Sequence, residues 1–153
     1  MGMRRHQAYA LLPQDCQRLG QMLDLDDWQS VLDINLSTRF EHWVNRPLFF
    51  PDTSSANCVW TTRLAGECFT LPVAHGEGRL VPEGSPAYLI TAVYGRKSDG
   101  ELFNSPNGSV IAAICSPDGL VMGMMPHPER RIDALRGGTQ GLAIFQAGVT
   151  AVC

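Results

Sequence analysis

The chain has no long apolar run, because none of its hydrophobic stretches approaches the roughly 18 residues typical of a membrane-spanning helix. It also lacks the charged start, apolar core and small-residue cleavage site of a secretory signal peptide. Basic residues are not in excess, since 12 Lys and Arg stand against 15 Asp and Glu for a net charge of −3. Nucleic-acid binding favours a basic surface. These absences exclude a membrane or nucleic-acid partner and favour a cytoplasmic protein.

The cysteines do not form a recognisable framework. Their number is odd and no two are spaced Cys-x-x-Cys, so neither a zinc site nor a set of disulfides is indicated, and we expect no metal. We interpret them as small buried hydrophobic side chains in a reducing compartment. A nucleophilic cysteine commonly lies at a helix N-terminus, and none here has a glycine-flanked turn before a helical pattern. The cysteines are Cys16, Cys58, Cys68, Cys115 and Cys153.

The pattern of apolar residues predicts a single α/β domain. The length of 153 residues and a hydrophobic content of 44% allow one domain with a substantial core. Helical spacing predicts a helix over 13–25 and a final helix over 139–152, with Thr139 as its N-cap. Short apolar runs between them predict strands, and Pro47 favours an edge position for the second of these. The predicted strands cover 31–36, 40–50, 68–74, 87–94, 110–115 and 120–125.

Turn signals separate these strands. Residues 51–56 are turn-like, and His75-Gly-Glu-Gly78 is a glycine-rich turn after a strand. Residues 98–100 and 106–108 also predict turns. The runs 110–115 and 120–125 flank Ser116-Pro-Asp-Gly119, so we expect them to form a hairpin.

The segment 123–130, Gly-Met-Met-Pro-His-Pro-Glu-Arg, is the most informative part of the chain. Side chains at positions i and i+2 of a strand share one face. If the chain stays extended through Pro128, the Glu129 carboxylate lies beside the His127 ring and orients it. A histidine oriented by a carboxylate is the base half of a nucleophile–base–orienter triad. A lone His-Pro-Glu is also common in surface loops, so this interpretation depends on the neighbouring motifs.

Five motifs in order support it. In this order and spacing the chain resembles the glutamine amidotransferase subunits of phosphoribosylformylglycinamidine synthases, which are class I glutamine amidotransferases of purine biosynthesis. The resemblance runs from about residue 35 to 145. The motifs are 35–41 (NLSTRFE), 72–79 (PVAHGEGR), 104–109 (NSPNGS), 123–130 (GMMPHPER) and 138–145 (GTQGLAIF).

The resemblance implies a fold and an activity. The fold is a flavodoxin-like open sheet with antiparallel excursions. The activity is hydrolysis of glutamine to glutamate and ammonia, with His127 as the general base and Glu129 as its orienting carboxylate. Ammonia would pass to a separate synthase subunit. The chain has no GxxxxGK[ST] phosphate loop, so the resemblance assigns ATP and Mg²⁺ to that partner.

Further positions are implied to bind substrate or to lie at the synthase interface. Arg39 could hold a carboxylate through paired hydrogen bonds, although an exposed ion pair explains it equally well. The 75–79 turn could equally carry solvated charges, and a metal at its histidine and glutamate lacks a third ligand. The implied residues are Arg39, Phe40, His75, Glu77 and Arg79.

The chain departs from the family pattern in one respect. The family's nucleophilic cysteine lies in a Gly-x-Cys-x-Gly turn upstream of the Asn-x-Ser-x-Arg-Phe-Glu motif, and no such turn occurs here. We therefore expect residues 1–153 to be an incomplete amidotransferase domain, inactive alone, whose partial sheet exposes apolar surface and favours self-association. The alternative is a non-catalytic module that binds the synthase subunit.

Overall fold

One antiparallel sheet forms most of the structure. The computed structural model describes residues 30–82, 88–95 and 108–152. In that part of the chain, five strands pair in the order β3-β2-β5-β6-β7, and every pairing is antiparallel. The strands are β2 (Glu41–Phe49), β3 (Cys68–His75), β5 (Leu89–Tyr94), β6 (Ile111–Cys115) and β7 (Met122–Met124). The expected α/β class is confirmed, with an antiparallel sheet.

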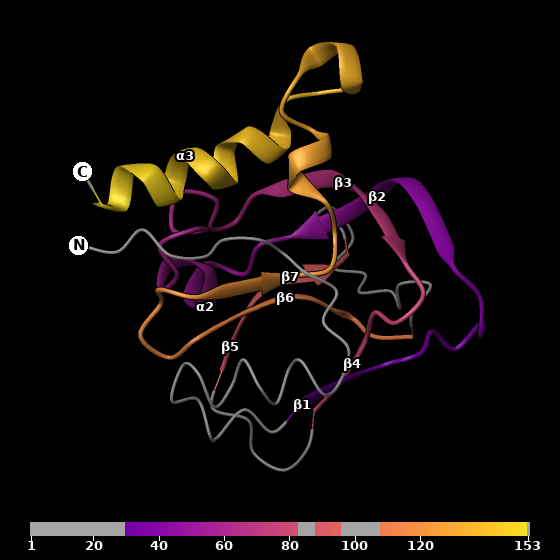
Figure 1. Cartoon of the computed structure of the whole chain (residues 1–153). Helices are drawn as coiled ribbons and strands as arrows, with labels where there is room; N and C mark the ends of the chain where they lie inside the picture. Colours follow the sequence, from indigo (N-terminus) through magenta and orange to yellow (C-terminus); the bar gives the residue numbers. More distant parts are fainter. Residues whose placement is uncertain (1–29, 83–87, 96–107, 153) are drawn as a thin grey trace.

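A two-stranded ribbon extends from this sheet. It pairs β1 (Ser30–Asp33) with β4 (Arg79–Pro82) in antiparallel register. Figure 1 shows the ribbon on the opposite side of the molecule from the last helix. The strand predicted over 31–36 ends early, because the chain turns after Asn35, whose carbonyl accepts the Thr38 N–H at 2.8 Å.

Pro47 does not place β2 at an edge, as the sequence suggested. It lies inside β2, opposite Thr70 of β3, while β5 pairs on the other side. The N–H and C=O positions of one strand residue face the same neighbour. The Pro47 carbonyl accepts from Gly95, so the missing donor faces the end of β5, where the ladder begins only at Leu48. The proline therefore removes no bond from the β2–β3 ladder.

Two helices complete the described fold. The single turn α2 (Asp52–Ala56) replaces the turn expected over 51–56, and it docks on β5 through a hydrogen bond of 2.7 Å from the Ser55 hydroxyl to the Thr91 carbonyl. The final helix α3 (Gln140–Val152) forms as predicted, after two glycines with positive φ. It runs along one side of the sheet (Figure 1).

Glycines allow α3 to lie close to its neighbours. A Cβ at Gly141 would collide with the Pro128 carbonyl, and one at Gly148 would collide with the Trp60 ring. Two short 3-10 turns, η1 (Pro128–Arg130) and η2 (Ala134–Arg136), connect β7 to this helix. The helix predicted over 13–25 and the turn over 98–100 lie outside the described residues.

The core lies between the sheet and the segments that cover it. Its largest members are fully buried residues from β2, β3, β5 and α3, with Trp60 and Phe69 packed against them. No described helix is long and apolar enough to cross a membrane. The largest buried core side chains are Tyr94, Phe50, Leu48, Leu71, Ile144 and Val73.

The hairpin turn between β6 and β7 gives a test of the fold. Gly119 has φ +77°, and a Cβ there would collide with the Asn57 carbonyl oxygen. We expect Gly119→Ala to lower the free energy of unfolding by about 2 kcal/mol, measured by urea titration, because both strain and a clash are introduced. Gly123→Ala is the control, since its Cβ meets only Ile114, at 3.9 Å. Equal effects of the two variants would contradict this explanation.

Candidate active site

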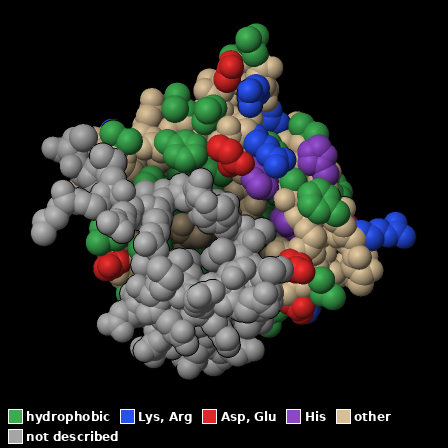
Figure 2. All heavy atoms as spheres, in the orientation of Figure 1, with side chains coloured by type: hydrophobic (Ala, Val, Ile, Leu, Met, Phe, Trp, Pro, Cys, Tyr) green, Lys and Arg blue, Asp and Glu red, His purple; other side chains and the backbone are tan. Residues whose placement is uncertain are grey.

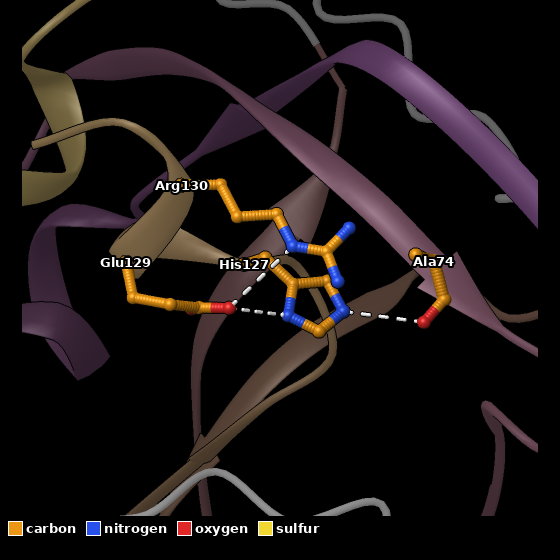
Figure 3. Close-up of polar contacts among 4 residues, drawn as sticks. All are labelled: Ala74, His127, Glu129 and Arg130. Carbon is orange, nitrogen blue, oxygen red and sulfur yellow. Dashed lines mark hydrogen bonds and ion pairs between the residues drawn. The ribbon is translucent and has the colours of Figure 1, made fainter. Parts of the chain in front are cut away.

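His127 lies just beyond β7 and is anchored to β3. Its backbone N–H donates to the Pro72 carbonyl at 2.8 Å. One ring nitrogen, Nε2, lies 3.2 Å from the Ala74 carbonyl oxygen, and the other, Nδ1, lies 2.7 Å from Glu129 Oε1. Figure 3 shows the ring held between these two oxygens. The contact expected between His127 and Glu129 is therefore present.

The path of the chain to Glu129 differs from the expected one. Residues Pro128–Arg130 form the 3-10 turn η1, with Pro128 at its start, where the missing N–H costs nothing. The Arg130 N–H donates to the His127 carbonyl at 3.2 Å and closes the turn. The tight turn returns the Glu129 carboxylate to the ring, so the contact forms without an extended backbone.

The hydrogen-bond partners limit what the His127 ring can do. Glu129 only accepts when ionised, so Nδ1 carries the proton that it binds. Nε2 lies 3.2 Å from the Ala74 carbonyl oxygen, which only accepts, so this contact is a hydrogen bond when Nε2 carries a proton as well. Two acceptors, one at each ring nitrogen, suit a ring that carries both protons, and the proton at Nε2 is the one that a general base gains and returns. Arg130 Nε stands 3.7 Å from the same Glu129 oxygen.

His75 forms a second, buried histidine site at the end of β3. Its side chain is 3% exposed, and its Nδ1 lies 2.9 Å from Asn35 Oδ1. The Asn35 amide nitrogen donates to the Arg39 and His75 carbonyls, which fixes the oxygen toward the ring. Nδ1 must therefore carry a proton, and a neutral His75 has its lone pair at Nε2. That nitrogen is buried without a hydrogen-bond partner among the described residues.

Electrostatics favour the neutral form of His75. Burial lowers the pKa of His75 below its usual value, and the nearby charge of His127 lowers it further. Glu41, paired with His75 across β2 and β3, acts in the opposite direction. The pKa of Glu41 itself is lowered by hydrogen bonds from Ser37 and Trp43. His75 therefore acts as a neutral polar group beside an ionisable base. Figure 2 shows histidine side chains beside acidic and basic ones on one face of the molecule.

The other residues singled out in the sequence divide into two groups. Phe40 is 69% exposed and lies over the turn, with Cδ2 3.9 Å from the Cβ position of Gly76. Arg39 is exposed, and Glu77 follows Gly76 in the turn. Arg79 instead forms an ion pair with Asp33 across the β1–β4 ribbon, and this contact lowers the pKa of Asp33.

Sequence reasoning missed Asn35, the Ala74 carbonyl and Arg131. Asn35 is the first residue of the 35–41 motif. Asparagine commonly begins turns, and this is the sequence signal that could have identified it. A backbone carbonyl leaves no trace in the residue pattern. Arg131 lies just after the 123–130 motif and no pattern marks it, yet it is 5% exposed.

No described cysteine adjoins His127. Cys58 and Cys115 are fully buried, and their thiols hydrogen-bond to each other, which lowers the pKa of Cys58 and raises that of Cys115. A substrate cannot reach either thiol. Cys68 is exposed, but it begins β3, six residues before Ala74, and a strand of that length spans about 20 Å. The described residues also contain no group of three metal-ligating side chains.

The fold and the histidine–carboxylate pair are those of an amidotransferase domain, and comparison with known families agrees. Residues 16–140 match the family described as CobB/CobQ-like glutamine amidotransferase domain. This chain belongs to that family.

Relatives within the family point to one kind of subunit. The chain is 42% identical over 100 residues to phosphoribosylformylglycinamidine synthase subunit PurQ of Trichormus variabilis, covering 60% of this chain and 42% of the relative. It is 45% identical over 84 residues to the PurQ subunit of Lacticaseibacillus paracasei, covering 54% and 36%. The chain thus spans less than half the length of these curated relatives.

A solved structure shares the fold. The structure of PurLQS from Thermotoga maritima superposes with a TM-score of 0.68 at 28% identity, covering 86% of this chain and 57% of that chain. The expected resemblance to class I glutamine amidotransferases is confirmed.

The glycines of the 75–79 turn give a test of the His75 site. A Cβ at Gly78 would collide with the His75 ring, whereas one at Gly76 meets only Phe40, at 3.9 Å. We expect Gly78→Ala to displace the ring and break its bond to Asn35, visible as a change in the His75 ring signals in ¹⁵N NMR spectra. Gly76→Ala, the matched control, keeps those signals. Unchanged signals in Gly78→Ala would contradict the described packing.

The lowered pKa of His75 predicts a pH dependence of stability. Below its unfolded pKa of about 6.5, the unfolded chain binds a proton that the folded chain does not. Stability is therefore present above that pH and is lost as pH falls toward the folded pKa. We expect the free energy of unfolding, measured by urea titration between pH 7.5 and 5.5, to fall more steeply with falling pH for the native chain than for His75→Gln. The difference in slope is up to about 1.4 kcal/mol per pH unit. Parallel curves would show that His75 does not contribute.

Proposed function

We propose that the chain forms part of the glutaminase subunit of a phosphoribosylformylglycinamidine synthase, in which His127 is the general base and Glu129 orients it. The observation that carries the proposal is the 2.7 Å contact between His127 Nδ1 and Glu129 Oε1. The contact lies within residues 16–140, which match the family. The similarity to PurQ subunits supports the same assignment.

The proposed reaction needs a thiol from a segment outside the described residues. His127 Nε2 takes the thiol proton, and the thiolate attacks the side-chain amide carbon of glutamine. The protonated ring returns that proton to the leaving nitrogen, so ammonia departs and a thioester remains. Water, deprotonated by the same ring, then releases glutamate and restores the thiol. Glu129 accepts the Nδ1 proton throughout and stabilises the imidazolium.

The residues around the base are assigned to substrate binding or to the interface. His75 is buried, so its part in this set is to hold the 75–79 turn through its bond to Asn35 rather than to contact the substrate. Arg79 is the weakest of the set because Asp33 already binds it. The assigned residues are Arg39, Phe40, His75, Glu77 and Arg79.

The remaining reaction steps are assigned to a partner. Ammonia passes to a synthase subunit, as the similarity to PurQ subunits supports. ATP and Mg²⁺ are assigned to that subunit, since this chain has no phosphate-loop sequence. We also assign the complex to the cytoplasm, on the similarity to PurQ subunits.

A non-catalytic module that binds the synthase is the second candidate. It is favoured by large apolar side chains exposed close together in the sequence, which is typical of an interaction surface. The same side chains would drive self-association of the isolated chain, and a monodisperse monomer in sedimentation velocity would contradict that expectation. They are Ile34, Leu36, Phe40, Trp43 and Val44.

Thiol labelling tests whether the chain alone carries a nucleophile. A thiol-reactive glutamine analogue, followed by mass spectrometry of peptides, identifies any nucleophile. We expect no selective labelling that glutamine blocks. Slow unselective labelling of exposed Cys68 and protection of buried Cys58 and Cys115 would fit the described burial. Stoichiometric, glutamine-blocked labelling of one cysteine would instead make this chain a complete glutaminase.

Reconstitution tests the proposed base. The chain is mixed with the portion of a PurQ relative that carries the Gly-x-Cys-x-Gly turn, together with a synthase subunit, and glutamate release is measured. We expect His127→Ala to lower kcat/KM at least about a hundredfold, and Glu129→Gln to lower it less. His42→Ala, a change at an exposed histidine of β2, is the control. Glutamate release that survives His127→Ala would overturn the proposal.

A further inference from the structure

Arg131 is a buried cation held by neutral acceptors. Its side chain is 5% exposed, and among the described residues no carboxylate pairs with it. Its Nη1 donates to the Arg136 carbonyl at 2.7 Å, and its Nη2 donates to the Val44 carbonyl at 2.8 Å and to the Asn45 side-chain oxygen. Burying a guanidinium is costly unless its donors are satisfied. Fastening a loop does not in itself require a buried charge. The three hydrogen bonds of the Arg131 guanidinium therefore indicate a specific role for this residue.

The acceptors on β2 lie at an irregularity of the sheet. Trp43 pairs with Val73 and Arg46 pairs with Leu71, so two residues of β2, Val44 and Asn45, face the single residue Pro72 of β3. Such a one-residue bulge interrupts the ladder and leaves backbone groups without partners in the neighbouring strand.

The turn that carries the histidine–carboxylate pair satisfies both sides of this bulge. At its first residue, the His127 N–H donates to the Pro72 carbonyl of β3 at 2.8 Å. At its last residue, Arg131 donates to the Val44 carbonyl of β2. The Arg131 backbone N–H also closes η1 on the Pro128 carbonyl at 2.9 Å. Glu129 lies between these two anchors, so its approach to the ring depends on both ends of the turn.

We propose that Arg131 is a positioning residue, which fixes the 127–131 turn on the β2–β3 bulge and thereby holds Glu129 against the His127 ring. Arg131 touches neither reacting atoms nor substrate. Its catalytic meaning rests on the proposed function, but its effect on the His127–Glu129 contact does not. If Arg131 only fastened the loop to the sheet, its replacement would leave the environment of the His127 ring unchanged.

The experiment observes the His127 ring directly in the whole chain. Long-range ¹H–¹⁵N spectra report the two ring nitrogens, and a downfield Nδ1–H signal reports the bond to Glu129, with Glu129→Gln used to assign it. Arg131→Met removes all side-chain donors of this residue and keeps its backbone N–H. We expect it to abolish the Nδ1–H signal of His127 while the backbone spectrum of the sheet is retained. Arg131→Lys keeps the charge without the two-pronged donor geometry, and we expect it to recover the signal in part.

A neighbouring arginine provides the matched control. Arg130 is half exposed and stands 3.7 Å from Glu129, yet it does not reach the bulge. We expect Arg130→Met to keep the Nδ1–H signal. A signal retained in folded Arg131→Met, or lost equally in Arg130→Met, would overturn the proposal.

A milder variant decides the case in which Arg131→Met does not fold. Asn45→Ala removes one exposed acceptor of the guanidinium and leaves the core intact. A weakened Nδ1–H signal in this variant supports the proposal, and an unchanged one overturns it. Loss of the signal in these variants, together with failed reconstitution of glutaminase activity by the unsubstituted chain, would retain the positioning role and reject the proposed function.

Discussion

The pairing of β2 with β3 is the constraint on which the described site depends. Between them these two strands carry the backbone anchors of the 127–131 turn and His75 itself. β3 supplies the carbonyls of Pro72 and Ala74 to His127 and ends in His75 itself, while β2 supplies the bulge that accepts Arg131. A regular ladder would satisfy the Val44 carbonyl within the sheet and leave the 127–131 turn without its second anchor. The irregularity of the sheet is therefore part of the site.

The two histidines show how one fold gives the same residue type different chemistry. His127 is partly exposed and faces a carboxylate that orients its ring. His75 is buried and faces an amide whose oxygen is fixed by two other hydrogen bonds. The first environment fixes the orientation of the ring, and the second favours a ring that stays neutral. The charge of His127 lowers the pKa of the nearby His75.

The parts of the structure that follow from local patterns were predictable from the sequence. The 116–119 hairpin, β3 and α3 depend on turn residues and apolar spacing, and they form where expected. The position of Pro47 was not predictable, because it depends on where β5 begins to pair. The His127–Glu129 contact was predicted for a different backbone, since a two-residue separation brings the side chains together in a 3-10 turn as well as in a strand. Asn35 and Arg131 depend on contacts between distant segments, which no local pattern records.

The glycines of α3 make the stability of this helix depend on its contacts with the rest of the fold. A glycine in the helix interior, such as Gly148, lowers intrinsic helix stability by about 1 kcal/mol, and 13 residues are marginal for an isolated helix in water. The close approach to Pro128 and Trp60 that these glycines permit offsets that loss only when the opposing surfaces already exist. The stability of the helix therefore depends on the assembled strands. The far-ultraviolet helical signal of the protein then reports whether its sheet is intact rather than any tendency of the segment itself.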